Sequence, residues 1–445
     1  MDLKHLHKRR KELMRLMGEG VAIVPTAPVY VRNRDVQFPY RPDSDFYYLT
    51  GFPEPEALAV FVPNRPKGQF VLFCRDKDPE RELWDGRRAG PEGAREVYGA
   101  DEAYPIAMAD TIIPALLENR KKVFYSMGRH TGLDGRTIGW LNEVRSRARS
   151  GVAAPVQIVD LDHILHELRL IKRPEEIARM RQAARISGSA HCRAMSACRP
   201  GLHEYELEAE LLYEFRKHGS ESPAYAPIVG GGENGCILHY VENRAELRNG
   251  DLVLIDAAAE FDGYAADITR TFPVNGRFSE AQRDVYEVVL AAQQAAINEV
   301  RPGNHWNEPH DRAVRVLTEG LVDLGLLRGT VDDLLASGDY RRFYMHRTGH
   351  WLGLDVHDVG DYKVDGEWRV FEPGMTLTVE PGLYIRAAED IEPRFRNLGI
   401  RIEDDVLVTQ KGHEVLTEGA PKTIDDIEHL MRSQRRSRPR GRQRA

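Results

Sequence analysis

The chain has 445 residues, of which 42% are hydrophobic and 29% charged, and its net charge is -7. This length exceeds what one hydrophobic core usually serves, so two domains are expected, and the balanced charge argues against nucleic acid as a main partner. No apolar run approaches the roughly 20 residues of a membrane helix, and the N-terminus lacks the apolar stretch of a signal peptide. The four cysteines form no C-x-x-C pair, which fits a reducing compartment. We therefore expect a cytoplasmic protein without a membrane partner.

Short apolar runs alternate with helical patterns over residues 1–170. Residues 110–120 (DTIIPALLENR) predict a helix. Five runs have the length and composition of strands: 21–24, 57–62, 69–73, 122–125 and 156–159. This alternation indicates an α/β N-terminal domain.

A second domain is expected over residues 171–431. It opens at Pro174, which suits the first turn of a helix. A further amphipathic helix over 205–219, strand-like segments to about 275, a helical block with Ser279 as N-cap, and strands from about 374 follow. The order helices, strands, helices, strands predicts an α+β domain with two similar halves.

The last stretch, residues 432–445, contains seven arginines and no acidic residue. Blocks of like charge without apolar residues are usually solvated, so a basic, disordered tail is predicted. A tether to RNA or to a membrane surface is the alternative.

The segment LVLIDAAAEFDGYAADITRTFPV predicts a β-hairpin that carries two carboxylates. If the turn is centred between Phe261 and Asp262, Asp256 and Asp267 stand directly opposite each other on one face. Opposed carboxylates repel each other, so a cation between them is expected. Two alternatives remain: an ion pair of Asp267 with Arg270, or a register that differs by one residue.

The segment HRTGHWLGLDVHDVG places three histidines within twelve residues: His346, His350 and His357. Neutral imidazole is a common metal ligand and can also donate to developing negative charge. The spacing of the first two resembles a zinc-protease helix, but Arg347 stands where that motif needs Glu, and two nearby glycines weaken a helix. We therefore reject the zinc-protease interpretation.

Two more acids, Glu380 in MTLTVEPGLYI and Glu403 in GIRIEDDVLVT, lie in strand-like runs. Either alone could be explained by an ion pair with Arg401 or Arg396. Four carboxylates and one imidazole together favour hard or borderline divalent ions such as Mn²⁺, Co²⁺ or Zn²⁺, and four negative charges nearly neutralise two such ions. A two-metal hydrolase is the prediction, in which a metal-bridging hydroxide attacks a carbonyl.

Taken in order, these residues resemble the metallopeptidase family with the pita-bread fold, which includes methionine aminopeptidase, prolidase, aminopeptidase P and creatinase. The family's ligand pattern falls on Asp256 in LIDAA, Asp267 in DITRTF, His350 in HWLGLDVHD, Glu380 in TVEPGLY and Glu403 in RIEDD. The segment FPYRPDSDFYYLTGFPEPEA is similar to the leading domain of aminopeptidase P and prolidase. The resemblance covers about residues 1–430 and implies an α/β N-terminal domain followed by an α+β pita-bread catalytic domain with pseudo-twofold halves.

The resemblance also implies roles for further residues. His239, His346 and His357 would contact substrate or stabilise the tetrahedral intermediate, and Glu380 would help to deprotonate the bridging water. Tyr384 and Arg401 would support the site.

Trp84, in ELWDGRR, is similar to a residue that reaches a neighbouring subunit's active site, so a homo-oligomer, dimer or tetramer, is expected. The loop DYKVDGEWRVFEPG is one residue longer than the family pattern. The family's substrate-loop arginine therefore has no firm counterpart in Arg369.

The resulting hypothesis is a metal-dependent aminopeptidase that acts on peptides with proline second. Two divalent ions are expected, with Mn²⁺ as the first choice and Co²⁺ or Zn²⁺ as alternatives. A prolidase restricted to X-Pro dipeptides would use the same ligands. A non-catalytic binding protein on the same fold is the rival from another class, but such relatives typically lose ligands.

Overall fold

The computed structural model describes residues 2–437, and the chain passes between two compact units at Arg169 and Leu170. The limits predicted from the sequence, 1–170 and 171–431, differ from this division by one residue at the junction. Each unit is described by itself below.

The first unit is built on a mixed six-stranded sheet. β1 pairs antiparallel with β4 and parallel with β7. In spatial order the strands are β6 (Glu102–Pro105), β5 (Phe70–Cys74), β4 (Leu58–Phe61), β1 (Val21–Pro25), β7 (Lys122–Phe124) and β8 (Gln157–Val159). The five predicted strands are all present. β6 is absent from the prediction because its residues are only half-buried and include a Glu and a Pro.

Helices cover this sheet. The predicted helix over 110–120 corresponds to α5, and α5 and α6 pack together on the core that the buried faces of β1, β4, β5 and β7 form. The helices are α1 (Leu3–Met17), α2 (Ser44–Thr50), α3 (Pro79–Asp85), α4 (Gly90–Glu96), α5 (Ala109–Leu117), α6 (Thr131–Ser146) and α7 (Asp162–Leu170). The α/β character of this unit agrees with the prediction.

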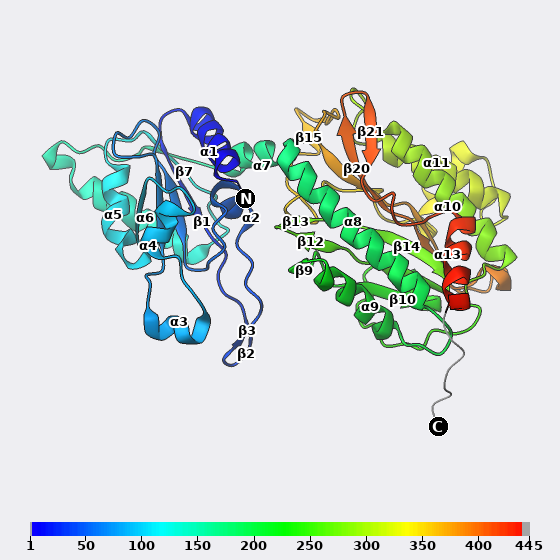
Figure 1. The fold of residues 1–445 in the computed structure, drawn as a ribbon. Coiled ribbons are helices and arrows are strands. Elements are labelled where there is room, and N and C mark those ends of the chain that lie inside the picture. The colour runs from blue at the N-terminus through cyan, green and yellow to red at the C-terminus, as the bar shows by residue number, and fades with distance from the viewer. Residues whose placement is uncertain (1, 438–445) are drawn as a thin grey trace. The chain divides into compact units, whose positions relative to one another are not determined.

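Two elements project from this unit with no buried residue (Figure 1). One is the hairpin of β2 (Val31–Asn33) and β3 (Val36–Gln37), and the other is α3. Trp84, on α3, is 86% exposed. Elements without a buried side chain gain little stability from packing against their own unit.

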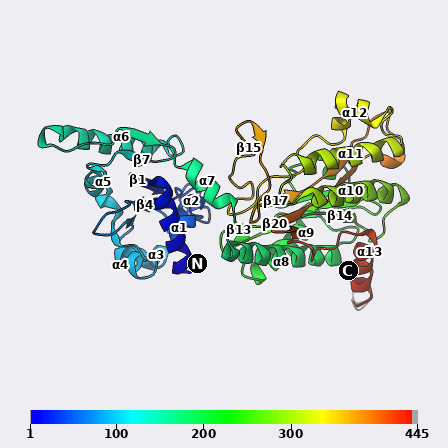
Figure 2. The ribbon, with the colours of Figure 1, turned by 90° about the horizontal axis from the view of Figure 1, so that it is seen from above.

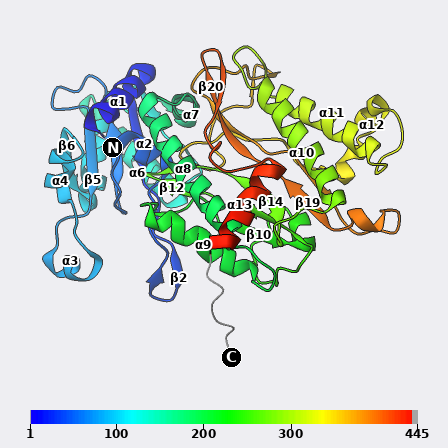
Figure 3. The same cartoon turned by 45° about the vertical axis from the view of Figure 1, so that its right-hand side comes forward.

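The second unit has two halves, each made of a helix pair and strands. Seen from above, strands β14, β17 and β20 lie between α8 and α9 on one side and α10 and α11 on the other (Figure 2). α13 packs beside α8 (Figure 3). The helices are α8 (Pro174–Ala197), α9 (Glu204–Lys217), α10 (Glu280–Glu299), α11 (Glu308–Asp323), α12 (Val331–Ser337) and α13 (Ile424–Ser437).

The strands of the second unit form several small antiparallel sheets. The first half holds β9 (Ser222–Pro223), β10 (Ile228–Gly231), β11 (Leu252–Asp256), β12 (Ala259–Phe261), β13 (Tyr264–Ala265) and β14 (Thr269–Pro273). The second half holds β15 (Lys363–Val364), β16 (Glu367–Trp368), β17 (Thr376–Val379), β18 (Gly382–Ile385), β19 (Leu398–Arg401), β20 (Asp404–Thr409) and β21 (Gly412–Val415).

Local sequence signals set the helix starts as predicted. Pro174 is the first residue of α8, and the backbone N–H of Arg173 donates to Glu176 at 3.1 Å. Ser279 caps α10, because its Oγ accepts from the backbone of Gln282 while the Gln282 side chain accepts from the Ser279 N–H.

The turn of the predicted hairpin is shifted by one residue. Phe261 pairs with Tyr264, so the turn is centred between Asp262 and Gly263 and not between Phe261 and Asp262. Asp262 has φ of 51° and Gly263 has φ of 83°, as a two-residue hairpin turn requires at both central positions. The Asp-Gly pair accepts these angles, and that preference decides the register.

At the C-terminus, α13 extends to Ser437 and therefore includes the first part of the predicted tail, residues 432–437. The remainder of the predicted tail, residues 438–445, lies outside the described residues. Within residues 2–437, no helix has the length and apolar character needed to cross a membrane.

Candidate metal centre

The carboxylates of the first predicted pair, Asp256 and Asp267, meet at one atom. The phenol oxygen of Tyr225 lies 2.5 Å from Asp256 Oδ1 and 2.5 Å from Asp267 Oδ1. A single O–H donates to one acceptor at a time, so this contact cannot satisfy both carboxylates. The Tyr225 hydroxyl therefore leaves one of the two carboxylate oxygens without a proton from it.

The hairpin register explains this convergence in a way that differs from the prediction. Asp256 pairs with Thr269 in the β11–β14 ladder, so it is not directly opposite Asp267. Asp267 and Thr269 are two residues apart and point to the same face. The two aspartates are thus diagonal neighbours on one face of the sheet. The shifted turn gives Asp256 a different directly opposite residue, but both aspartates still point to the same face.

His350 faces the carboxylates through one ring nitrogen. Its Nδ1 lies 2.9 Å from the carbonyl oxygen of Trp351, which accepts the imidazole N–H. The other nitrogen, Nε2, lies 3.3 Å from Asp267 Oδ2 and 3.7 Å from Glu380 Oε1. A histidine held in this way at Nδ1 presents the lone pair of Nε2, as metal-bound histidines do.

The two glutamates close the site from the second half of the unit. Glu380 follows β17, and Glu403 lies between β19 and β20 with 1% exposure. One ligand atom each from Asp267, His350 and Glu403 lie within 4.8 Å of one another. Glu403 Oε2 accepts a hydrogen bond of 2.6 Å from the hydroxyl of Thr269. All five residues predicted as ligands are therefore together in one place.

The electrostatics of the site show an excess of negative charge. Burial raises the pKa of Glu380 to about 7, against the opposing effects of His350 and Arg401, and raises that of Glu403 well above its usual range. Burial and the neighbouring acid also raise the pKa of Asp267. Burial alone would lower the pKa of His350, but the carboxylates outweigh it and raise the pKa to about 9. Four crowded carboxylates and one imidazole fit two divalent cations.

A chain of hydrogen bonds leads away from Asp256. Arg401 donates to Asp256 Oδ2 at 2.7 Å and to the Tyr384 hydroxyl at 3.0 Å. That hydroxyl lies 2.8 Å from His346 Nε2, and His346 Nδ1 lies 2.7 Å from the Arg347 carbonyl oxygen. Both nitrogens of His346 are engaged, and burial lowers its pKa to about 4. In this structure His346 therefore holds Tyr384, and the role toward substrate expected from the resemblance stays a prediction.

The other two predicted histidines, His239 and His357, are exposed and line a cavity that also contains the five predicted ligands. Within residues 2–437 neither ring makes a hydrogen bond. The His357 ring lies edge-on to His350 with 4.2 Å between ring centroids. Their ring nitrogens are thus available to a ligand, unlike those of His346.

The cavity above the five ligands has a volume of about 900 Å³, enough for a short peptide. Arg347 and Lys363 line it, whereas Arg369 does not. Its apolar wall consists of Ile228, Leu238, Val241, Trp306, Val356 and Trp368. Trp84 lies in the first unit, so its predicted contact with a neighbouring subunit's site stays a prediction.

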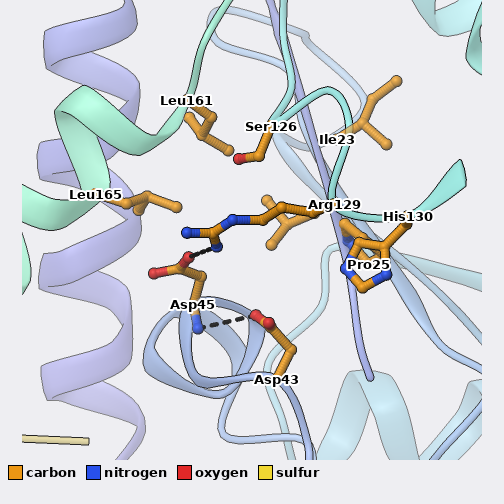
Figure 4. A pocket seen from close by; sticks show the side chains of 10 residues that line it. Ile23, Pro25, Asp43, Asp45, Ser126, Arg129, His130, Leu161 and Leu165 are labelled. Atoms are coloured by element: carbon orange, nitrogen blue, oxygen red, sulfur yellow. Dashed lines mark hydrogen bonds and ion pairs between the residues drawn. The ribbon is translucent and has the colours of Figure 1, made fainter. Parts of the chain in front are cut away.

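A second group of possible ligands lies in the first unit and has a different character. Ligand atoms of Asp45, Asp162 and His166 also lie within 4.8 Å of one another. Here, however, Arg129 lies 3.0 Å from a carboxylate oxygen of each acid, and Arg169 lies 2.8 Å from Asp45. Figure 4 shows the Arg129 guanidinium reaching Asp45 from across the pocket. These arginines supply the positive charge, so we do not interpret this group as a metal site.

The ion pairs considered as alternatives for the ligands are arranged differently. Arg270 pairs with Asp404 at 2.7 Å and not with Asp267. Arg396 donates to backbone carbonyls. Arg401 pairs with Asp256, one acid among four.

Some residues of the site were not predicted. Tyr225, 31 positions before Asp256, carries no sequence signal that connects it to the aspartates. Asp405 places both carboxylate oxygens 3.2 Å from the backbone N–H of Asp267. Asp405 follows Glu403 by two residues in an alternating strand, so the two side chains are expected on the same face. That spacing could have predicted Asp405 as a residue of the site.

Comparisons with known proteins agree with this geometry. Residues 178–410 match metallopeptidase family M24, and residues 6–125 match the N-terminal domain of aminopeptidase P. The chain belongs to metallopeptidase family M24. It is 46% identical to the Xaa-Pro aminopeptidase of Escherichia coli over 430 residues, 96% of this chain and 97% of that protein. It is 34% identical to human Xaa-Pro aminopeptidase 3 over 438 residues, 95% of this chain and 84% of that protein.

Solved structures give the same result. An aminopeptidase from Pseudomonas aeruginosa superposes with a TM-score of 0.97 at 56% identity, covering 98% of this chain and 99% of that one. Aminopeptidase P from Escherichia coli with the inhibitor Pro-Leu gives a TM-score of 0.95 at 45% identity, covering 98% and 100%. The fold expected from the resemblance, an α/β domain followed by a pita-bread catalytic domain, is confirmed.

Proposed function

We propose that this protein removes the first residue from peptides whose second residue is proline. The observation that carries the proposal is the convergence of five ligand side chains under a cavity with two unengaged histidines. The identity of 46% to an Xaa-Pro aminopeptidase supports it. Structures of the Escherichia coli protein with substrate and with product also support a peptide ligand.

Two divalent ions would be held by Asp256, Asp267, His350, Glu380 and Glu403. Mn²⁺ is the expected ion, because a donor set with four carboxylates and one imidazole favours hard or borderline metals, with Co²⁺ and Zn²⁺ as alternatives. When bound, such ions would supply a water of lowered pKa and would polarise the scissile carbonyl.

The chain's own residues supply the remaining steps. Glu380, whose Oε1 lies 3.7 Å from His350 Nε2, is placed to remove a proton from the attacking water and return it to the leaving nitrogen. His357 and His239 have free ring nitrogens and can donate to the developing oxyanion or to the peptide. Tyr384 and Arg401 fix Asp256, and His346 fixes Tyr384.

Proline in the second position explains the need for such a cavity. The bond before proline has no N–H, so a site cannot grip it through that donor. Recognition must come from shape and from the remaining polar groups. The apolar wall opposite the carboxylates provides a surface on which the ring of proline can be buried.

The test is hydrolysis of an X-Pro-Y tripeptide with Mn²⁺ by the wild type and by Glu380→Gln. The variant should lose about 10²–10⁴-fold in kcat, because the proton acceptor is removed. Glu372→Gln is the matched control, since Glu372 is exposed and does not line the cavity. No turnover by the wild type, or equal turnover by Glu380→Gln, refutes the proposal.

Comparison of substrates separates the alternatives. A prolidase would cleave X-Pro dipeptides and leave tripeptides uncut. A non-catalytic binding protein would cleave neither, and near-zero metal content after loading with Mn²⁺ would favour it.

A homo-oligomer, dimer or tetramer, is part of the proposal. It is supported by α3, which has no buried residue. Leu83 and Trp84 of this helix are each 86% exposed. Large exposed apolar side chains on a projecting element are typical of interfaces. Light scattering should show a smaller particle for Trp84→Ala than for wild type, and Val156→Ala, which alters an equally exposed residue, should leave the size unchanged. Equal sizes for all three would contradict this contact.

A cytoplasmic location is likewise proposed. The free thiols of Cys74, Cys192, Cys198 and Cys236 support it. One relative, 35% identical over 432 residues, is named as mitochondrial, so cell fractionation has to distinguish the two.

A further inference from the structure

The segment that carries His346 and His350 is fixed at its middle residue, Thr348. This residue is 3% exposed, and its Oγ1 lies 2.8 Å from His310 Nδ1 and 2.6 Å from the Tyr344 hydroxyl. His310 lies in the first turn of α11. Neither His310, Thr348 nor Tyr344 lines the cavity. Three buried or half-buried polar groups therefore meet just behind the site without reaching the substrate.

The direction of these hydrogen bonds follows from what each group can do. Tyr344 is 1% exposed, and within residues 2–437 its hydroxyl contacts no other hydrogen-bonding group, so it must donate to Thr348 Oγ1. The Thr348 hydroxyl then donates to Nδ1 of a neutral His310. Burial, helped by Arg347 and His346, lowers the pKa of His310 to about 3, which keeps the ring neutral. Each of the two hydroxyl protons thus has an acceptor.

The backbone of the same segment is tied to the strand end that carries Glu380. The carbonyl oxygen of Thr348 accepts from the Glu380 N–H at 2.8 Å. The His350 N–H donates to Thr378 Oγ1 at 3.1 Å, and the His350 carbonyl accepts from the Thr378 N–H at 3.0 Å. The Thr348 side chain thus anchors to α11 a segment whose backbone positions two of the five ligands.

We propose that the hydrogen-bond chain Tyr344–Thr348–His310 is a positioning device that sets His350 and Glu380 for the metal ions and His346 for Tyr384. These three are positioning residues, since none of them lines the cavity. Partners that orient metal ligands in this way commonly change metal affinity or activity when they are removed. The consequence for turnover rests on the proposed function, whereas the consequence for metal binding does not.

The first test compares Thr348→Val, which keeps the shape and loses the hydroxyl, with Thr348→Ser, which keeps the hydroxyl. We expect Thr348→Val to weaken Mn²⁺ binding, measured by titration calorimetry, by about 10–100-fold and to lower kcat similarly, with KM for an X-Pro-Y tripeptide little changed. Thr348→Ser should remain within a few-fold of wild type. A side chain that only filled space would be better replaced by Val than by Ser.

A second pair of variants keeps the test decisive if Thr348→Val does not fold. His310→Asn retains an acceptor within reach of the Thr348 hydroxyl, and His310→Leu removes it. Asn should preserve Mn²⁺ affinity and Leu should lower it. The visible absorption of the Co²⁺-loaded protein, which reports ligand geometry, should change in His310→Leu and stay unchanged in His310→Asn.

The outcomes separate this inference from the function on which it rests. Wild-type Mn²⁺ affinity and an unchanged Co²⁺ spectrum in both Thr348→Val and His310→Leu overturn the positioning role, whatever the substrate. Equal losses in Thr348→Val and Thr348→Ser also overturn it. A wild type that binds Mn²⁺ but cleaves no X-Pro peptide refutes the proposed function and leaves the metal titrations as the test of the hydrogen-bond chain.

Discussion

Glu403 and Asp404 are consecutive in the chain and equally inaccessible, with exposures of 1% and 0%, yet their surroundings are opposite. Asp404 is surrounded by cations and donors: Arg270 at 2.7 Å, Lys422 at 2.5 Å and the Thr417 hydroxyl at 2.7 Å. Glu403 accepts a hydrogen bond from the Thr269 hydroxyl, and the effect of the neighbouring carboxylates on it outweighs that of Arg401. Asp404 therefore forms ion pairs with two cations of the chain, whereas Glu403 lies mainly among other acids.

The pKa values of the two acids reflect this difference. Burial would raise both, because a charged carboxylate loses its hydration. For Asp404 the attraction of Arg270 and Lys422 outweighs burial and lowers the pKa below its usual range. For Glu403 the neighbouring Asp267 adds to burial and raises the pKa well above its usual range. A buried acid with its own cations supports the fold, whereas a buried acid among acids is suited to bind a cation from outside.

The largest expected effect comes from exchanging each acid for its amide. Asp404→Asn should lower the free energy of unfolding by about 3–5 kcal/mol, because Arg270 and Lys422 stay buried without their counter-charge. In protein stripped with EDTA, Glu403→Gln should cost little or stabilise, since it removes a buried acid whose charged neighbours are mainly other acids. Urea denaturation of both variants measures the difference.

This comparison fails if the two amides destabilise the metal-free protein equally. Thr417→Val gives a control of intermediate size, since it removes one neutral donor to Asp404 and should cost only about 1 kcal/mol.

The second expected effect is stabilisation by the metal itself. Mn²⁺ at about 100 times its dissociation constant should add about 2.7 kcal/mol to the stability of the folded state, equivalent to a rise in Tm of roughly 3–5 °C. Glu403→Gln should lose most of this rise. Scanning fluorimetry with Mn²⁺ and with EDTA measures it, and an unchanged Tm in the wild type would show that the carboxylates around Glu403 need no ion.

Much of this arrangement follows from local sequence. Apolar runs predicted five of the six strands in the main sheet of the first unit, and the N-cap pattern at Ser279 predicted the start of α10. The ligand residues were found because acids in otherwise apolar strands are unusual, and a family resemblance then placed them in order. The acids in apolar strands and the family motifs can both be recognised from a few neighbouring residues.

What the sequence did not predict depends on residues far apart in the chain. The partner of Asp404, Arg270, lies 134 positions away, and the two were not connected beforehand. Tyr225 and the Tyr344–Thr348–His310 chain were missed for the same reason. The role of His346 toward substrate stays a prediction, but the engagement of both its ring nitrogens by Tyr384 and Arg347 was not predicted. The hairpin register was wrong by one turn position because the prediction gave the Asp262–Gly263 pair too little weight.

The smallest expected effect is a pH dependence that should exist only without metal. The folded-state pKa values of Glu380, about 7, and His350, about 9, lie above the ordinary 4.5 and 6.5. The folded state therefore binds protons more tightly than the unfolded chain, so these groups stabilise fully at low pH and lose that contribution as pH rises through 7 and then 9. Asp404 has a lowered pKa, so its contribution is constant over this range.

In EDTA we therefore expect the Tm to fall by a few °C between pH 6 and pH 9. Mn²⁺ competes with protons for the same atoms, so its affinity should rise over the same range and flatten or reverse the trend. Glu380→Gln, which removes one of the site's acids with a raised pKa, should reduce the fall in EDTA, whereas Glu372→Gln should leave it unchanged. A Tm in EDTA that rises from pH 6 to pH 9 would mean that the site's carboxylates are already balanced within the chain, as Asp404 is, and the contrast between the two neighbouring acids would then not mark a metal centre.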